Sequence, residues 1–367
     1  MLQTLQEQPN YTCTETVERF FRVNPARKFQ LHDTLRLEVA LVAGQEMYAF
    51  PGARRFEAVS LEDMIGDTGA ISNGDFALHA RAIFGSQGPV FTYRGEGSDG
   101  DRPWVRFDYD VALKVSGFQL KHGSQKAITA YHGSFDADPR TLDIERIVLI
   151  ADQIPAVIGF KKTIKNLSFA RIKIGEGTFL LPSESDMTIV ENDNAENLNE
   201  SKFSSCRQFT GESVLTFDEP SGAATSVPAR IEEVKLPAEI SLPLVLDQAI
   251  EARRAAIGDP VTAHIFADVK VKSRLVVPKG AIVHGRVTRA EQHHDYVLLG
   301  IELMEMEWKG AHAVLHADLN RAVDNLTARQ TRRTIDPIRE HEGLLMIGLQ
   351  QSSDLPRGLL MYWTTTP

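Results

Sequence analysis

The chain has 367 residues, of which 43% are hydrophobic and 24% charged, with a formal net charge of −9. This length predicts two domains, because one hydrophobic core rarely serves more than roughly 250 to 300 residues. The negative charge argues against a nucleic-acid partner, which would need a basic stripe, and no run of 18 apolar residues predicts a membrane span.

The N-terminus does not resemble a signal peptide. Met1 is followed by Leu-Gln-Thr-Leu-Gln-Glu, which has neither a basic start nor a long apolar run. Two interpretations remain open at this point: a cytoplasmic protein, or an exported protein whose signal has been removed.

The first element is predicted to be a helix of about three turns. Thr12 and Glu15 have the spacing of a capping box, and the chain reaches Pro25 soon afterwards. Apolar residues follow at helical spacing: Cys13, Val17, Phe20 and Phe21.

A hairpin and a second helix come next. Thr34–Val42 alternates apolar and polar residues, and Glu46–Phe50 returns as its partner strand. The second helix has Ser72 or Asn73 as its cap and Gly85 as its stop. Its apolar stripe consists of Phe76, Ala80, Ile83 and Phe84.

Residues from Val90 to Phe217 are predicted to be mostly strands separated by Gly, Asp and Pro turns. Asn192–Ser201 is polar and is expected to be a loop, followed by Cys206–Phe217 as the last strand. The order of helix, hairpin, helix and meander predicts a mainly β (α+β) fold. We expect an open antiparallel half-barrel with plugging helices on its concave side.

A second, smaller β-barrel is predicted after a linker. The predicted limits are residues 1–218 for the half-barrel, 219–237 for the linker and 238–367 for the barrel. Leu275–Val287 predicts two antiparallel strands joined by a tight Pro-Lys-Gly turn. The expected strands are Leu242–Leu246, Val261–Val271, Leu275–Val277, Ile282–Ala290, Tyr296–Trp308, Ala313–Leu319 and Leu359–Thr365.

No sequence pattern indicates catalysis, a metal or a cofactor. His293 and His294 are adjacent, so in a regular strand they point to opposite faces and cannot share an ion. Glu305 and Glu307 share a strand face, which we interpret as solvent-exposed. No Gly-x-Ser-x-Gly elbow or phosphate-binding loop occurs. We therefore expect a protein that is not an enzyme.

The two cysteines, Cys13 and Cys206, allow two interpretations. They could be buried free thiols, or they could form one disulfide, which is expected only if the protein is exported. A bond that closes so long a loop would contribute at most roughly 4 to 5 kcal/mol in the chain-entropy model.

The C-terminal region resembles the periplasmic β-barrel domain of the scaffold protein of type IV secretion channels. The resemblance rests chiefly on Pro278-Lys279-Gly280-Ala281, with Gly258-Asp259 before it and Leu355-Pro356-Arg357-Gly358-Leu359 at the end. It covers about a third of the chain and implies a β-barrel interaction module.

The N-terminal region resembles, in its pattern of elements, the half-barrel of periplasmic lipoprotein carriers. The whole chain is similar to uncharacterised exported bacterial proteins that join the two regions. Its segments Asn10-Tyr11-Thr12-Cys13 and Cys206-Arg207-Gln208-Phe209 carry that similarity. This resemblance implies a periplasmic or cell-envelope location and a Cys13–Cys206 disulfide.

These resemblances imply a non-enzymatic protein that holds an acyl chain or a lipidated partner in the half-barrel. Candidate ligand-lining residues are Leu37, Val39, Phe76, Ile83 and Phe84. Two alternatives stay open. One is a docking module of an envelope assembly, with an envelope protein as partner and no ligand. The other is a hydrolase with a site scattered over loops, which no sequence pattern supports.

Overall fold

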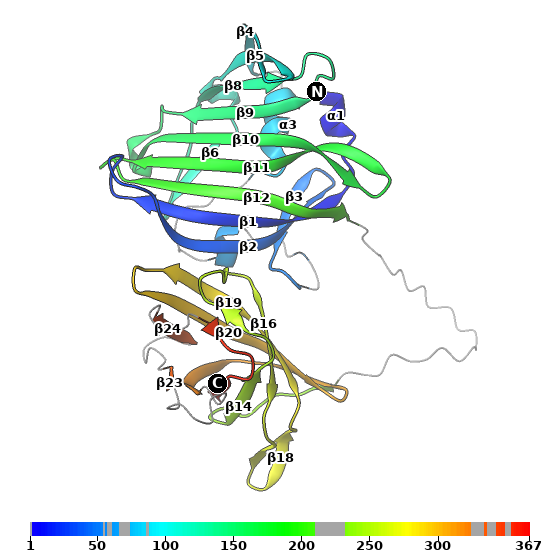
Figure 1. Cartoon of the computed structure of the whole chain (residues 1–367), viewed down its shortest axis with the longest axis vertical. Coiled ribbons are helices and arrows are strands. Elements are labelled where there is room, and N and C mark those ends of the chain that lie inside the picture. The colour runs from blue at the N-terminus through cyan, green and yellow to red at the C-terminus, as the bar shows by residue number, and fades with distance from the viewer. Residues whose placement is uncertain are drawn as a thin grey trace, which may run out of the picture. The chain divides into compact units, whose positions relative to one another are not determined.

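The computed structural model describes residues 2–53, 56, 61–65, 74–85, 88–209, 232–323, 334–335, 343–348 and 354–367. The chain folds as two compact units, Met1–Gly211 and Glu212–Pro367 (Figure 1). Both are built mainly of strands, which confirms the predicted fold class. The predicted domain limits stay a prediction, because most of the predicted linker lies outside the described residues. None of the described helices is long and apolar enough to cross a membrane.

One curved antiparallel sheet of ten strands forms the first unit. Its strands, in spatial order, are β3 (Gln45–Ala49), β2 (Gln30–Val42), β1 (Tyr11–Arg22), β12 (Glu196–Gln208), β11 (Gly177–Glu191), β10 (Phe160–Ile174), β9 (Ile144–Ala151), β8 (Tyr131–Ala137), β5 (Arg102–Val111) and β4 (Val90–Asp99).

Short helices and turns pack against this sheet. Two of the helices, α1 and α3, lie on its concave face. Figure 1 shows α3 behind β9 and β10. The helices are α1 (Leu2–Gln6), α2 (Leu61–Ile65) and α3 (Leu78–Gly85). The remaining elements are two 3₁₀ turns, η1 (Leu113–Val115) and η2 (Ala156–Ile158), and the hairpin β6 (Gln119–His122) with β7 (Gln125–Ile128).

The predicted first helix is wrong, because this segment is strand β1. Its backbone pairs with β2 on one side and with β12 on the other. Every second residue is buried, namely Tyr11, Cys13, Glu15, Val17 and Arg19. This period of two overrides the capping-box pattern, and the β-branched and aromatic residues of the segment favour a strand.

The predicted polar loop at Asn192–Ser201 is also wrong in its second half, which belongs to strand β12. Asn199 and Ser201 are buried there although they are polar. Polar residues on the inner face of a sheet break the apolar alternation by which a strand is recognised from sequence. Much of the predicted last strand, from residue 210 on, lies outside the described residues.

Helix α3 ends at the predicted Gly85, but it begins at Leu78, so Asp75 and Phe76 lie before it and not in its first turn as predicted. The predicted caps, Ser72 and Asn73, lie outside the described residues. Glu46 of β3 caps the start of the helix. Its carboxylate accepts hydrogen bonds from the backbone N–H groups of Gly74, Ala77 and Leu78.

A second curled sheet forms the second unit, antiparallel except where β13 joins β21. Its order is β13 (Glu232–Glu233), β21 (Ala311–Val314), β20 (Tyr296–Trp308), β19 (Ile282–Gln292), β16 (Pro260–Ile265), β14 (Ser241–Leu246), β26 (Leu360–Thr365), β22 (Ala317–Val323) and β23 (Thr334–Ile335), with β24 (Leu344–Gly348) on β20. Two small ribbons complete it: β15 (Ile250–Glu251) with β25 (Asp354–Leu355), and β17 (Val269–Val271) with β18 (Arg274–Val277).

The Pro-Lys-Gly segment connects its two strands without pairing them among the described residues. β18 pairs with β17, whereas β19 pairs with β16 and β20. The predicted hairpin across this turn is therefore wrong, although both strands exist. Gly280 has a φ of +82°, which favours glycine at the turn.

A disulfide joins Cys13 of β1 to Cys206 of β12. The two strands are neighbours, and the bond lies at an irregularity of their register between Thr12 and Thr14. It connects the first strand in the sequence to a strand about 190 residues later. The bond therefore fastens the early strands of the half-barrel to the late ones.

Reduction of this disulfide is expected to destabilise the first unit. The free energy of unfolding should fall by up to about 4 to 5 kcal/mol, because the unfolded chain regains the entropy of an open loop. Thermal unfolding with and without dithiothreitol measures the effect. Cys13→Ser/Cys206→Ser is the control and should not respond to the reductant. An unchanged melting temperature of the reduced wild-type protein would contradict the expectation.

Candidate functional site

The concave face of the first unit divides into two regions of different chemistry. Strands β5, β8 and β9 contribute mainly apolar and aromatic side chains, together with Leu5 of α1 and Ile83 of α3. Strands β1, β10, β11 and β12 contribute buried polar and charged side chains. Within each region lies a smaller group of neighbouring side chains. We call these two groups the aromatic cluster and the polar cluster and define their residues below.

The aromatic cluster consists of Phe84 of α3, Phe91 and Tyr93 of β4, Phe107 of β5 and Phe135 of β8. Phe135 is central to it: its ring meets those of Phe84 at 4.9 Å and Phe91 at 5.8 Å edge-on, and that of Phe107 at 5.3 Å in a stack. Phe84 also stacks on Phe91 at 6.1 Å, and Tyr93 contacts Phe107 at 5.5 Å. Such contacts stabilise the rings beyond their area burial.

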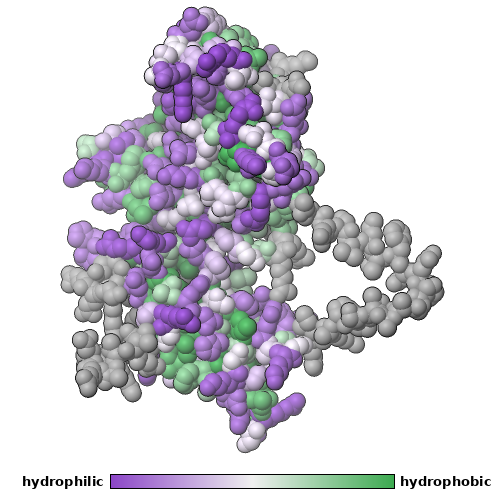
Figure 2. Space-filling view, turned by 45° about the vertical axis from the view of Figure 1, so that its right-hand side comes forward, coloured by the Kyte–Doolittle hydropathy of each residue, from purple (hydrophilic) through white to green (hydrophobic). Residues whose placement is uncertain are grey.

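This cluster reaches the solvent along β4. Phe91 is 44% exposed, Tyr93 is 55% exposed and the neighbouring Val90 is 65% exposed. β4 ends the order of the sheet and pairs with β5 alone in the described part of the chain. Figure 2 shows hydrophobic side chains at the surface of this part of the first unit. Exposed apolar residues in a contiguous group on a sheet edge are unusual and mark interaction sites.

The polar cluster consists of Glu15, Asp75, His79, Lys165 and Ser185. The Lys165 ammonium donates to Asp75 and also, at 2.8 Å, to Nε2 of His79. The Ser185 hydroxyl donates to the other oxygen of Asp75 at 2.6 Å. The cluster thus connects the segment just before α3 to strands β10 and β11. Because His79 accepts at Nε2, its ring is neutral.

The electrostatics of this cluster follow from burial and from its ion pair. Burial opposes ionisation of Asp75, but the neighbouring Lys165 ammonium outweighs it and holds the pKa of Asp75 well below its usual range. Burial and then Lys165 lower the pKa of His79. Burial and the neighbouring Asp75 raise the pKa of Glu15 to about 8, although Ser201 hydrogen-bonds to Glu15 and opposes the rise. Glu15 is therefore protonated at neutral pH.

The five predicted ligand-lining residues fall into two groups. Leu37, Val39, Phe76 and Ile83 are fully buried in the packed interior. Phe76, for example, lies between Tyr11 at 4.6 Å and Phe203 at 5.3 Å. Phe84 belongs to the partly exposed aromatic cluster. A ligand role for all five stays a prediction, and the first four can touch a ligand only if packed side chains move.

The polar cluster and most of the aromatic cluster are not predicted from the sequence. Lys165 lies with Thr163 and Leu167 at the inward positions of β10, so the period of two could have placed it on the buried face. Its partner Asp75 is 90 positions away, and no local pattern predicts that contact. Phe91 and Phe135 lie in predicted strands, but their common face depends on the curvature of the sheet.

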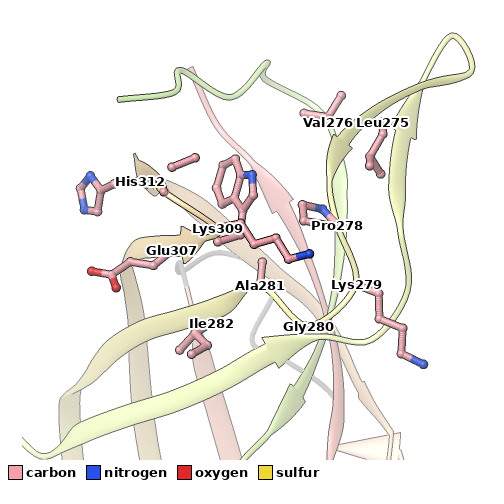
Figure 3. A pocket seen from close by; sticks show the side chains of 13 residues that line it. Leu275, Val276, Pro278, Lys279, Gly280, Ala281, Ile282, Glu307, Lys309 and His312 are labelled. Carbon is pink, nitrogen blue, oxygen red and sulfur yellow. The ribbon is translucent and has the colours of Figure 1, made fainter. Parts of the chain in front are cut away.

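A pocket of about 820 Å³ lies in the second unit. It is formed by the segment Leu275–Ile282 on one side and by the hairpin end Glu307–His312 on the other (Figure 3). Leu275 and Ile282 are among its exposed apolar residues. The pocket therefore includes the Pro-Lys-Gly turn that carries the predicted resemblance to secretion scaffold proteins.

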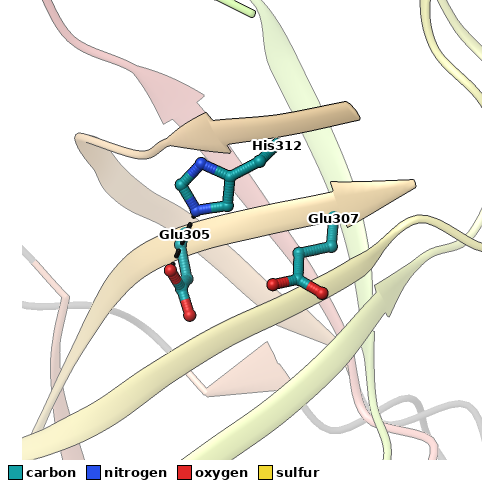
Figure 4. Close-up of side chains that lie close together, drawn as sticks. All are labelled: Glu305, Glu307 and His312. Carbon is teal, nitrogen blue, oxygen red and sulfur yellow. Dashed lines mark hydrogen bonds and ion pairs between the residues drawn. The ribbon is translucent and has the colours of Figure 1, made fainter. Parts of the chain in front are cut away.

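Three side chains beside this pocket come close together: Glu305 and Glu307 of β20 and His312 of β21 (Figure 4). Their nearest ligand atoms all lie within 4.8 Å of one another, and Nε2 of His312 is 2.9 Å from Oε2 of Glu305. His293 and His294, the densest histidine pair in the sequence, are engaged elsewhere. The ring of His293 stacks on that of Tyr296, with 4.4 Å between the ring centroids, and the His294 side chain is hydrogen-bonded to the carboxylate of Asp295.

Comparisons with known proteins found no matching family model and no matching curated protein. A candidate outer membrane lipoprotein-sorting protein domain from Vibrio parahaemolyticus is similar at 11% identity and a TM-score of 0.29, over 58% of this chain and 94% of that chain. A LolA superfamily protein from Nitrosomonas europaea is similar at 11% identity and a TM-score of 0.30, over 57% and 93%. The resemblance of the second unit to secretion scaffold proteins stays a prediction.

Loss of Lys165 is expected to destabilise the first unit strongly. Lys165→Met leaves the carboxylate of Asp75 buried without its ammonium partner, which should cost about 3 to 5 kcal/mol of the free energy of unfolding. Denaturant unfolding measures the loss. Lys162→Met, on the opposite face of the same strand, is the matched control. Equal stabilities of the two variants would show that the ion pair does not hold the segment before α3.

Glu15→Gln is expected to change the pH dependence of stability. Below about pH 4.5 the Glu15 carboxyl is neutral in both folded and unfolded chains, so wild type and variant differ little. Between about pH 4.5 and pH 8 the unfolded chain releases the proton that the folded protein keeps, so the wild type loses stability relative to the variant. At pH 8 the variant should be the more stable by a few kcal/mol, as an order of magnitude.

Thermal unfolding of the wild type and of Glu15→Gln from pH 5 to pH 9 measures this difference in stability. The contributions of Asp75, His79 and Lys165 largely cancel, because both proteins contain these residues. Glu18→Gln, on the outer face of β1, is the control. A difference between Glu15→Gln and wild type that does not grow with pH would contradict a protonated Glu15.

Proposed function

We propose that the first unit binds an acyl chain, presented by a lipid or by a lipidated partner, at the aromatic cluster. The observation that carries this proposal is the contiguous group of partly exposed aromatic side chains on β4, above the concave face. The protein acts as a binding protein of the cell envelope and not as an enzyme. The resemblance of its sequence pattern to lipoprotein carriers supports the same function.

An acyl chain fits the chemistry of this cluster. Its rings offer flat apolar surface, and each methylene that leaves water contributes about 0.8 kcal/mol, so a chain needs no charged anchor. A chain lying over Phe91 and Tyr93 would cover the apolar surface that these residues leave in water. Phe84 and the buried Phe135 pack against Phe91, so the exposed rings rest on further aromatic side chains.

An envelope location is supported by the disulfide. Both cysteines of the chain are used in it. Structural disulfides persist in oxidising compartments such as the bacterial periplasm and are rare in the cytosol.

One observation favours the alternative of a docking module without a ligand. Leu37, Val39, Phe76 and Ile83 are closed within the core, so the inner part of the concave face is filled by the protein's own side chains. A docking module would use the exposed β4 edge for a protein partner instead of an acyl chain.

Binding of a fluorescent fatty acid to the full chain tests the proposal. Phe91→Ser/Tyr93→Ser removes two partly exposed rings and should weaken binding at least about tenfold, since each ring contributes on the order of 1 kcal/mol or more. Phe21→Ser is the control, because Phe21 is also partly exposed but lies on β1, away from the cluster. Fatty-acid binding that the double variant leaves unchanged would exclude the aromatic cluster as the site.

Mass spectrometry of lipids carried through a gentle purification separates the two functions. A co-purified acyl chain supports the carrier. A protein that carries no lipid after purification and does not bind the fluorescent fatty acid supports the docking module.

A further inference from the structure

We propose that Glu305, Glu307 and His312 form a binding site for a divalent metal ion of the Zn²⁺ type. No metal site is predicted from the sequence, because the three residues come together only through the pairing of β20 with β21. This site is independent of the acyl-chain site proposed for the first unit.

A two-residue turn brings the ligands together. Trp308 pairs with Ala311, so Lys309 and Gly310 form the turn, and both have positive φ angles, of 22° and 78°. Positive φ at both positions is the geometry of tight β-hairpin turns. The register that this turn imposes places Glu307 directly opposite His312.

Glu305 completes the group from the same strand. It lies two residues before Glu307, and successive side chains of a strand alternate, so both carboxylates project from one face. Figure 4 shows the three side chains on the same side of the hairpin, with the dashed line joining His312 and Glu305. The backbone of a regular hairpin thus fixes all three ligands.

The spacing suits a small ion. Zinc lies about 2.0 to 2.2 Å from imidazole nitrogen and carboxylate oxygen, so two ligands of a tetrahedral ion are roughly 3.3 to 3.6 Å apart. The three ligand atoms already lie within 4.8 Å of one another. Small side-chain rotations therefore suffice, and the ion would replace the hydrogen bond between His312 and Glu305.

The ligand set determines the class of metal. One imidazole and two carboxylates suit Zn²⁺ and neighbouring divalent transition metals better than a soft thiolate-seeking ion. Three protein ligands leave a coordination position for water or for another molecule. His312 and Glu305 are half-buried, with side chains 21% and 32% exposed, so an ion can reach them from solvent.

The metal site adjoins the pocket of the second unit. Glu307 and His312 are both among the residues that line the cavity of about 820 Å³. In Figure 3 their side chains leave neighbouring strands in the same direction, at one end of the pocket lining. A molecule in the pocket could therefore lie next to the bound ion.

Calorimetric titration of Zn²⁺ into the full chain, freed of metal by a chelator, tests the site. We expect one ion per chain. His312→Ala and Glu307→Gln should each weaken binding by at least about tenfold, because even the loss of an outer-shell partner costs 10- to 100-fold. The two cysteines do not compete as ligands, because they form the disulfide.

His294→Ala is the matched control, since His294 lies on the β19–β20 turn and is bonded to Asp295. It should bind Zn²⁺ as the wild type does. Thermal unfolding without metal shows whether each variant folds. If His312→Ala does not fold, the Zn²⁺ affinity of Glu307→Gln decides the outcome. No stoichiometric binding by the wild type, wild-type affinity in Glu307→Gln, or a loss of affinity confined to His294→Ala would overturn the proposal.

Discussion

The buried ion pair between Asp75 and Lys165 is the interaction on which the arrangement of the concave face depends. Asp75 lies in the turn just before α3, and Lys165 projects inward from the middle of the sheet. Burying two charges is costly, so each is tolerated only because the other is there and because Ser185 and His79 satisfy the remaining polar atoms. This pair fixes the helix start to the sheet, and Glu46 fixes it from a second side.

Fixing α3 in this way sets the position of two consecutive apolar residues on the concave face. Ile83 is buried in the apolar region, and Phe84, the next residue of the same helix, packs against that region as part of the aromatic cluster. The cluster stays partly open because it ends on β4, which pairs on its outer side with none of the strands that the structure describes and leaves Phe91 44% exposed. The polar cluster therefore holds the start of α3 on the sheet, and the aromatic cluster provides the surface that we propose for an acyl chain.

The sequence predicts much of the fold because alternation is a local property. Tyr296–Trp308 is a strand with the predicted bounds, and α3 ends at the predicted Gly85. The errors come from segments in which local patterns conflict: β1 contains a capping-box pattern, and β12 buries polar residues. The candidate sites were harder to predict. Asp75 meets Lys165 across 90 positions, whereas His312 could have been placed opposite Glu307 from the turn between them.

A crystal structure of the protein with a fatty acid brominated at its terminal carbon would show where the acyl chain binds, because the anomalous signal of bromine locates the chain. We expect bromine beside Phe91 and Tyr93, with Asp75 and Lys165 still paired. Bromine next to Lys165, with the ion pair broken, would show that the polar cluster opens to ligands. That result, or a first unit without bound fatty acid, would contradict the division of the concave face proposed above.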